Sequence, residues 1–191
     1  MANIVVVNWM TLDGVTQGPG RPGEDESDGF QSSGWAQGYT DDVVSRQIGA
    51  VMSGTHHYLF GHRSYDVMLE SWNEQGGPFR DALNRTRKYV ASTNDSAHLA
   101  WPNSTLLSGD VTEAVADLKA NSEHDLVIMG SSRLIGSLIP SRLIDEYLLV
   151  IAPLVLGEGR KLFPSGAAAT LRLVDSVPAS TGALVARFTS A

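Results

Sequence analysis

The feature that most constrains this chain is an alternation of short apolar runs with segments of helical periodicity. The apolar runs are rich in β-branched and aromatic residues, as buried strands are, and they lie at residues 3–8, 57–61, 88–93, 104–109 and 125–130. Helical patterns accompany them at residues 40–52, 64–72, 78–85, 110–121 and 131–139. Strands that alternate with helices favour a mainly parallel sheet with helices on both faces.

The C-terminal part of the chain departs from this alternation, because its apolar segments are all strand-like. Residues 145–157 read as one long apolar strand, and residues 171–176 and 183–190 flank Pro178 and Gly182, which is typical of an antiparallel hairpin. The predicted fold is therefore α/β, a doubly wound and mainly parallel sheet closed by a C-terminal antiparallel hairpin. With 191 residues and no second core, residues 1–191 are expected to form one domain.

Two helix starts carry recognisable capping residues. Thr40 precedes the helix whose Val44 and Ile48 share one apolar face, so it is the expected N-cap. Asp110 and Glu113 have the spacing of a capping box at the start of the 110–121 helix. Both side chains are expected to bind amide hydrogens of the first helical turn.

Composition excludes several classes of partner and chemistry. The net charge of −7 argues against nucleic acid or an anionic membrane as the main partner, since both attract basic surfaces. The absence of cysteine excludes disulfides and thiolate chemistry, and His56, His57 and His62 straddle a strand, so no metal site is expected. There is no secretory pattern at the N-terminus and no run of about 20 apolar residues, so a cytoplasmic location is expected.

Residues 14–38 form a long segment rich in glycine and proline, with four acidic residues and almost no apolar periodicity. A loop of this length inside a compact domain is usually functional or disordered. It is interpreted either as a lid that uses Trp35 to exclude water from a site, or as an acidic disordered insertion. The sequence does not decide between them.

Three strand-to-helix junctions carry small or hydroxyl side chains: residues 61–64, 92–94 and 130–133. A helix start presents unpaired amide groups and a partial positive charge, which suit a phosphate where no side chain blocks the approach. Gly130-Ser131-Ser132 leaves the backbone of one junction free of bulky side chains. Arg63 adds a positive charge to the junction at residues 61–64, and Arg133 adds one to the junction at residues 130–133. Ordinary capping and turn formation explain any single junction equally well.

Six ordered segments resemble a known family. They are NWMTLDG near the start, LFGHRSYDVM, WPNSTLLSGDV, VIMGSSRLIGSLI, LIDEYLLVIAPLVLGEGRKLF and finally LRLVDS. In order and spacing the chain resembles the dihydrofolate reductase-like superfamily over nearly its whole length. It is most similar there to single-domain proteins like the C-terminal reductase domain of the bifunctional riboflavin-biosynthesis deaminase-reductase (RibD).

The resemblance implies an NADPH-dependent reductase, commonly a homodimer, and it implies which residues hold the cofactor. These are Gly61, His62, Arg63, Ser64, Ser92, Thr93, Gly130, Ser131, Ser132, Arg133 and Leu134. His62 stands where dihydrofolate reductases often have arginine, and Arg63 and Arg133 are expected to compensate for it.

On the substrate side, the resemblance points to the end of the first strand. Asn8, Thr11 and Asp13 are the candidate catalytic residues, with Asp13 the candidate proton donor, although Asp13-Gly14 is also a plain turn signal. The candidate substrate-binding residues are Met10, Gly14 and Trp35. Riboflavin reductases have a Glu-Gly-Gly-like sequence where this chain has Met129-Gly130-Ser131, which departs from the family pattern.

Three hypotheses follow. The first is an NADPH-dependent reductase of a pteridine- or pyrimidine-like heterocycle, nearest to 5-amino-6-(5-phosphoribosylamino)uracil reductase. The second is a nucleotide-binding module that kept the fold and lost the chemistry, and the third is a structural domain with ordinary caps at every junction. A homodimer is expected if the 145–157 strand packs against a symmetry mate, whereas the same strand also fits the centre of a single sheet.

Overall fold

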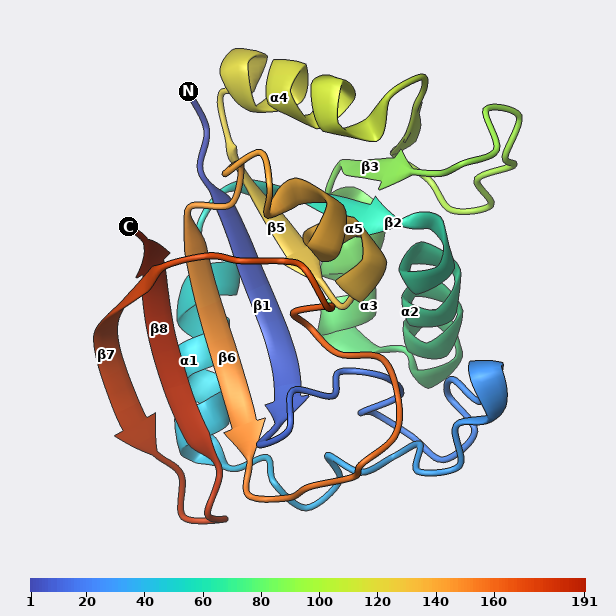
Figure 1. Cartoon of the computed structure of the whole chain (residues 1–191). Coiled ribbons are helices and arrows are strands. Elements are labelled where there is room, and N and C mark those ends of the chain that lie inside the picture. Colours follow the sequence, from blue (N-terminus) through green and yellow to red (C-terminus); the bar gives the residue numbers. More distant parts are fainter.

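The computed structural model of the protein describes all 191 residues and contains one eight-stranded sheet with the order β4-β3-β2-β5-β1-β6-β8-β7 (Figure 1). The strands are β1 Ile4–Thr11, β2 His56–Gly61, β3 Lys88–Ala91, β4 Ser104–Leu107, β5 Asp125–Met129, β6 Glu146–Ala152, β7 Leu171–Pro178 and β8 Leu184–Ser190. The neighbours from β4 to β6 pair in parallel, and β8 and β7 add an antiparallel hairpin. The predicted fold class is confirmed.

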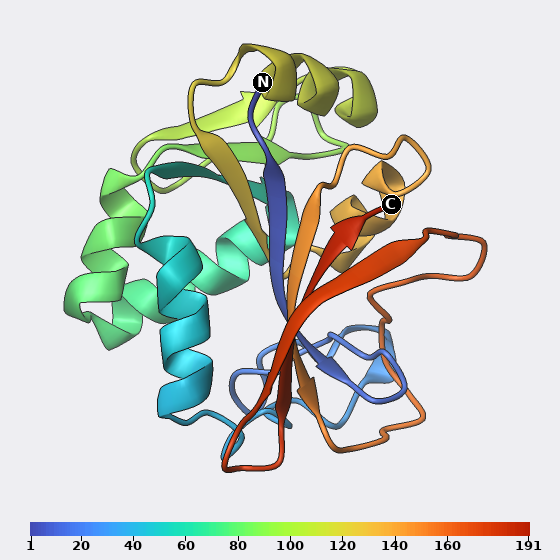
Figure 2. The same cartoon turned by 90° about the vertical axis from the view of Figure 1, so that its left-hand side faces the viewer.

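Helices cover the sheet in two layers (Figure 2). Their bounds are α1 Asp42–Met52, α2 His62–Gln75, α3 Gly77–Arg85, α4 Val111–Asn121 and α5 Ser132–Leu138, with a short 3-10 turn at Ser27–Gly29. Buried residues of α1, α2 and α3 join one core cluster, whereas those of α4 and α5 join the other. None of the helices is long and apolar enough to cross a membrane.

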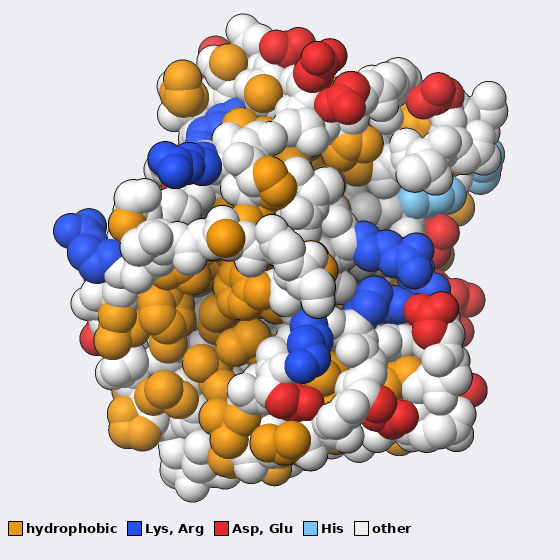
Figure 3. Space-filling view, in the orientation of Figure 1, with side chains coloured by type: hydrophobic (Ala, Val, Ile, Leu, Met, Phe, Trp, Pro, Cys, Tyr) orange, Lys and Arg blue, Asp and Glu red, His pale blue; other side chains and the backbone are white.

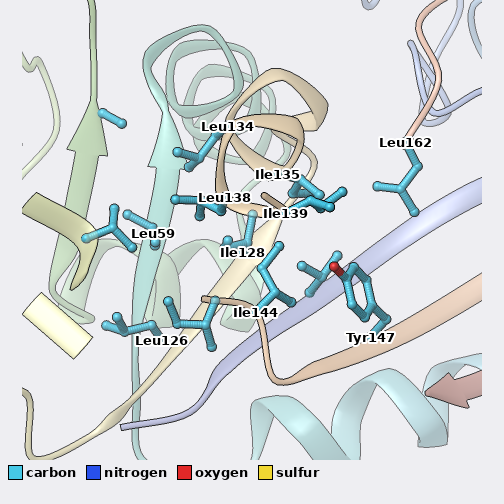
Figure 4. Packing of buried hydrophobic residues seen from close by; sticks show 14 of the residues in the cluster. Leu59, Leu126, Ile128, Leu134, Ile135, Leu138, Ile139, Ile144, Tyr147 and Leu162 are labelled. Carbon is cyan, nitrogen blue, oxygen red and sulfur yellow. The ribbon is translucent and has the colours of Figure 1, made fainter. Parts of the chain in front are cut away.

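The two hydrophobic core clusters lie on opposite faces of β1. Ile4 and Val6 pack toward α4 and α5, and Val5 and Val7 pack toward α1, α2 and α3. This two-sided burial explains why the first strand is a continuous apolar run rather than an alternating one. Figure 4 shows α5 placing Leu134, Ile135 and Leu138 over the sheet, where each fully buried aliphatic side chain contributes about 1.5–3 kcal/mol.

Two expectations about element ends are wrong. Asp41, not Thr40, caps α1: one carboxylate oxygen accepts a hydrogen bond from the Val44 amide at 2.9 Å. The other oxygen accepts a hydrogen bond from the Ser180 amide at 2.7 Å, so a contact with the turn of the C-terminal hairpin favours Asp41 as the cap.

The predicted long strand at residues 145–157 is shorter in the structure. It ends at Ala152, because Pro153 has no amide hydrogen to donate to a neighbouring strand. What remains, β6, lies between β1 and β8 in the middle of the sheet.

The 14–38 segment packs against the body of the protein. Val15, Phe30 and Trp35 form a small buried cluster with Ala152, and the Trp35 indole donates a hydrogen bond to the Gln17 carbonyl at 2.7 Å. The interpretation of this segment as a disordered insertion is therefore wrong.

Residues 153–170, which we call the strap, run from β6 to β7. The strap contacts the 14–38 segment through an isolated antiparallel β-bridge between Val15 and Lys161.

Candidate functional site: a cleft at the carboxyl ends of the strands

A cleft of about 600 Å³ opens at the carboxyl ends of the central parallel strands. Asn8 of β1, Gly61 at the end of β2 and Gly130 after β5 all line it. Parallel α/β sheets bind ligands at this edge, and the volume falls within the usual range for small-molecule sites. Two of the predicted strand-to-helix junctions, at residues 61–64 and 130–133, therefore meet at one place. The third prediction is wrong, because residues 92–94 follow β3 and lead through a loop to β4, so no helix begins there.

Every residue predicted to hold the cofactor lines this cleft: Gly61, His62, Arg63, Ser64, Ser92, Thr93, Gly130, Ser131, Ser132, Arg133 and Leu134. Hydrogen bonds join the two main junctions to each other. The Gly61 amide donates to Ser131 Oγ at 2.9 Å, and the Ser131 amide donates to Ser64 Oγ at 2.9 Å. Two hydrogen bonds thus join the starts of α2 and α5, and they use the amide hydrogens of Gly61 and Ser131.

Neither helix that starts at the cleft has a side-chain cap. Gly61 precedes α2 and Ser131 precedes α5, and neither accepts a hydrogen bond from the first turn with its side chain. The first-turn amides of these helices have no partner within the helix, so they are available to a ligand. Gly130 and Ser131 both have positive φ, 66° and 61°, and this left-handed bend makes glycine the suitable residue at position 130.

The arginines of the cleft are paired with acids of the 14–38 segment. Arg63 Nη2 lies 2.7 Å from Asp25 Oδ1, and Arg160 of the strap binds both Asp25 and Asp28. Burial raises the pKa of Asp25, but hydrogen bonds from Ser27 and the charges of Arg160 and Arg63 outweigh it, so the pKa lies below its usual value. An anion that binds Arg63 must therefore compete with Asp25.

The other basic residues at the cleft are less strongly held. Arg133 is largely exposed and lies 3.9 Å from Asp28, and His62 Nε2 lies 3.6 Å from Asp66 within α2. Figure 3 shows basic side chains next to acidic ones at the side of the molecule where α2, α5 and the 14–38 segment meet. The positive charge expected to compensate for His62 is present there, but carboxylates partly neutralise it.

On the substrate side, the structure separates the candidate catalytic residues. Asn8 lines the cleft and its side-chain amide donates to the Gly130 carbonyl at 3.4 Å, whereas Thr11 and Asp13 do not line it. The Thr11 hydroxyl donates to Asp13 at 2.6 Å, and the Gly157 amide donates to it at 2.9 Å. The Thr11 bond, followed by the Gly157 and Leu156 amides, lowers the pKa of Asp13 to about 2. An ionised turn carboxylate outside the cleft does not fit the role of proton donor.

The predicted substrate-binding residues also lie outside the cleft. Met10 faces the α4 and α5 side of β1 and packs against that core cluster, and Gly14 accepts a backbone hydrogen bond from Leu162. Trp35 is buried in the cluster that anchors the 14–38 segment. Trp9, one residue before Met10, lines the cleft instead, because successive side chains of a strand point to opposite faces.

Sequence reasoning missed several residues of the site. Trp9, Ile48, Met68 and Met129 are partly buried apolar residues that line the cleft and pack against the core on the α1 face. Ile48 was available from the helical periodicity of α1. Asp25 and Arg160 had no sequence signal, since their ion pair joins residues 135 positions apart.

The sequence was also compared with known proteins. The sequence profile of the family described as the RibD C-terminal domain matches residues 2–185. The uncharacterized protein YyaP of Bacillus subtilis is 29% identical over 110 residues, which cover 55% of this chain and 57% of that protein. The match thus spans little more than half of that relative.

Two solved structures show the same fold. A putative riboflavin biosynthesis protein from Shewanella sp. PV-4 superposes with a TM-score of 0.70 at 18% identity, covering 100% of this chain and 99% of the other. Dihydrofolate reductase from Enterococcus faecalis, complexed with NADP(H), superposes with a TM-score of 0.62 at 14% identity, covering 98% and 96%. At such identities the likeness establishes the fold alone.

Proposed function

This chain belongs to the RibD C-terminal domain family, and from that premise we propose that it is an NADPH-dependent reductase. Its substrate is a pteridine- or pyrimidine-like heterocycle, nearest to that of the 5-amino-6-(5-phosphoribosylamino)uracil reductase of riboflavin biosynthesis. The observation that carries the proposal is the pair of uncapped helix starts, α2 and α5, joined by hydrogen bonds at one cleft.

The residues at the two helix starts fit a dinucleotide. Gly61 and Gly130 leave the backbone accessible, and the first-turn amides that follow them suit a pyrophosphate. The Ser64 hydroxyl accepts from the Ser131 amide, and its own hydrogen remains available to a phosphate oxygen. Ser92 and Thr93 directly follow β3 and would border the adenosine part. NADPH, when bound, supplies the hydride.

The apolar end of the cleft suits a flat ring. Trp9 of β1, Ile48 of α1 and Met68 of α2 come from three elements and line the same cleft. Aromatic and aliphatic walls of this kind exclude water from a reducible ring and hold it against the cofactor, which hydride transfer requires. The side-chain amide of Asn8 donates to the Gly130 carbonyl at 3.4 Å, so it lies beside the Gly130 turn and would orient the ring.

One observation favours the alternative of a nucleotide-binding module without chemistry. The two carboxylates that line the cleft, Glu24 and Asp25, both accept hydrogen bonds, and Asp25 also pairs with Arg63 and Arg160. The lowered pKa of Asp25 keeps it ionised, so Asp25 is not a ready proton donor. An assay of NADPH oxidation with a panel of pterins and aminopyrimidines separates the two functions, because steady substrate-dependent oxidation excludes the binding module.

Titration of NADPH and NADH against the intrinsic tryptophan fluorescence tests the cofactor assignment. Trp9 lies in the cleft, so binding should change its emission, with an affinity in the micromolar range. Absence of binding by either nucleotide contradicts the proposal. Arg63→Ala should weaken NADPH more than NADH if Arg63 reads the extra phosphate, and Arg21→Ala is the matched control, because Arg21 forms a surface ion pair with Glu74.

A further inference from the structure

The middle of the 14–38 segment is held in place by charge rather than by apolar burial. Residues 15–18, Phe30 and residues 35–36 are buried and anchor the segment on both sides, whereas no residue from 19 to 29 is buried. A stretch without buried apolar contacts opens at a lower cost than the elements around it. We call residues 19–29 the acidic tip, because they include all four acidic residues of the segment, Glu24, Asp25, Glu26 and Asp28.

Asp25 of the acidic tip lies between two arginines that line the cleft. Arg63, in the first turn of α2, donates to Asp25 Oδ1 at 2.7 Å, and Arg160 of the strap donates to Asp25 Oδ2. The Asp25 side chain keeps only 13% of its surface accessible. Each carboxylate oxygen is therefore bound by a different guanidinium group, and three segments far apart in the sequence meet at this carboxylate.

The two guanidinium groups form the kind of site that binds a phosphate. Arginine pairs with carboxylate and with phosphate oxygens through the same planar set of donors. A phosphate group carries more negative charge than a carboxylate and presents three oxygens instead of two, so it fits the same two arginines. In the structure, the Asp25 carboxylate stands in the place that such a group would take.

The acidic tip also pairs with the remaining positive charge at the cleft. Asp28 accepts from Arg160 Nη1 at 2.7 Å and lies 3.9 Å from Arg133. Arg63, Arg133 and Arg160 are the three arginines that line the cleft, so each of them faces a carboxylate of the acidic tip. A ligand with negative charge therefore meets arginines that are already paired.

We propose that Arg63 and Arg160 form a subsite for a phosphate group of the ligand, and that Asp25 occupies this subsite until the ligand displaces it. Asp25 is then an internal competitor. It lowers the affinity of the cleft for phosphate-bearing ligands, and a ligand without such a group cannot replace it. Displacement also releases the acidic tip, because none of its residues is buried. The inference rests on the proposed function only in that the cleft takes a phosphate-bearing ligand.

Isothermal titration calorimetry with inorganic pyrophosphate, at one low ionic strength, tests the competition directly. Asp25→Asn keeps the shape of the side chain and removes its charge, so it should bind pyrophosphate roughly tenfold more tightly than the wild type does. Glu74→Gln is the matched control. It removes one negative charge and the 3.0 Å ion pair with Arg21 of the acidic tip, but neither residue lines the cleft, so the affinity should not change.

The role of Arg160 is tested by combining variants. In an Arg160→Gln background, Asp25→Asn should give a much smaller gain in pyrophosphate affinity, because one of the two arginines that it frees is absent. Lys161→Gln provides the control background, since Lys161 is the next residue of the strap, is exposed and does not line the cleft. The full gain should persist there. An equal gain in both backgrounds excludes Arg160 from the subsite and overturns the proposal.

The proposal is also overturned if Asp25→Asn binds pyrophosphate no more tightly than the wild type, or if neither protein binds it. Hydrogen exchange of the wild type gives a second measurement, which decides the matter if the variant does not fold. Saturating pyrophosphate should speed the exchange of amide hydrogens in residues 19–29, because the acidic tip is released. Unchanged or slower exchange in these residues contradicts displacement.

Titration of NADPH, NADH and ribose 5-phosphate against the wild type and Asp25→Asn identifies the source of the phosphate. A gain for NADPH alone assigns the subsite to the extra phosphate of that cofactor, and a gain for both dinucleotides assigns it to their pyrophosphate. A gain for ribose 5-phosphate alone assigns it to the substrate. A pyrophosphate gain without NADPH binding contradicts the proposed cofactor and supports this inference. NADPH binding that Asp25→Asn leaves unchanged, with no pyrophosphate gain, supports the cofactor and overturns this inference.

Discussion

The helices of this protein begin in two ways. α1 and α4 each begin at an aspartate, Asp41 or Asp110, whose carboxylate accepts a hydrogen bond from a first-turn amide at 2.9 Å. α2 and α5 begin at Gly61 and Ser131, which provide no such bond. α3 also has no side-chain cap, but a proline in its first turn removes one of the free amides. The two uncapped starts without proline are the two that meet at the cleft.

This difference shows where the sequence gives up local stability. A good N-cap contributes about 1 kcal/mol, and the chain has carboxylate caps at α1 and α4, away from the cleft, but none at α2 and α5, where we propose that an anion binds. Sites that break a local rule while the rest of the fold obeys it are typical of function. The predictions below test whether α2 and α5 lack side-chain caps because an anion binds at their first turns.

The largest effect is expected when an uncapped start receives a carboxylate of its own. Gly61→Asp should weaken NADPH binding roughly 100-fold, because a fixed negative charge would occupy the place of the pyrophosphate, and like charges in contact cost several kcal/mol. The backbone at Gly61 has φ −75° and ψ 146°, and a Cβ there would be 3.7 Å from its nearest neighbours, so the change fits. Stability should be equal or higher.

Gly61→Asn is the matched control for this prediction, since asparagine caps a helix nearly as well and carries no charge. Its effect on NADPH affinity should be much smaller than that of aspartate. Both variants are measured by fluorescence titration and by urea unfolding. Equal affinities for wild type and Gly61→Asp would show that the start of α2 does not hold the phosphates.

The positions of these helix starts could be predicted from the sequence because the signals are local. A β-branched run followed by glycine, serine and a helical pattern is contained within about a dozen residues, and residues 125–139 show it most clearly. The same holds for the C-terminal hairpin. The structure confirms the predicted sheet, and these elements occur in it where the sequence predicts them.

The rest of the site depends on information that is not local. β1 is buried on both faces, so its apolar run does not show that Trp9, and not Met10, faces the cleft. Thr40 and Asp41 are both good capping residues, and the choice depends on Ser180 in a distant turn. The Arg63, Asp25 and Arg160 cluster joins three separate segments. Sequence patterns carry no record of such contacts.

A second, smaller effect is expected from the bond that joins the two uncapped starts. Ser64→Ala removes the acceptor of the Ser131 amide and leaves that amide unpaired at the cleft, which costs about 1–3 kcal/mol. NADPH affinity should fall by roughly tenfold as the α5 start loses its fixed position. Ser53→Ala, at the exposed end of α1, removes a hydroxyl bonded to Ala50 and should change neither affinity nor stability appreciably.

At the capped start of α4, we expect the loss of the cap to lower stability and to leave NADPH affinity unchanged. Asp110→Ala should lower the free energy of unfolding by about 1 kcal/mol, because the Glu113 amide loses its acceptor, and should leave NADPH affinity unchanged. Urea unfolding and the fluorescence titration measure the two quantities on the same sample. A loss of affinity comparable to that of Ser64→Ala would remove the distinction between capped and uncapped starts.

The smallest effect is expected in the free energy of unfolding at acidic pH. The hydrogen bond from the Val44 amide, followed by those from Ser180, holds the pKa of Asp41 below its usual value of 3.8. A carboxyl with a depressed pKa in the folded state contributes stability that is complete above its unfolded pKa. That contribution is lost as the pH falls through the folded pKa, so α1 should loosen only in strong acid. Asp41→Asn should flatten this part of the curve of unfolding free energy against pH. The uncapped starts have no carboxylate, so Gly61→Asn should leave the same part unchanged, and Gly61→Asp alone should steepen it.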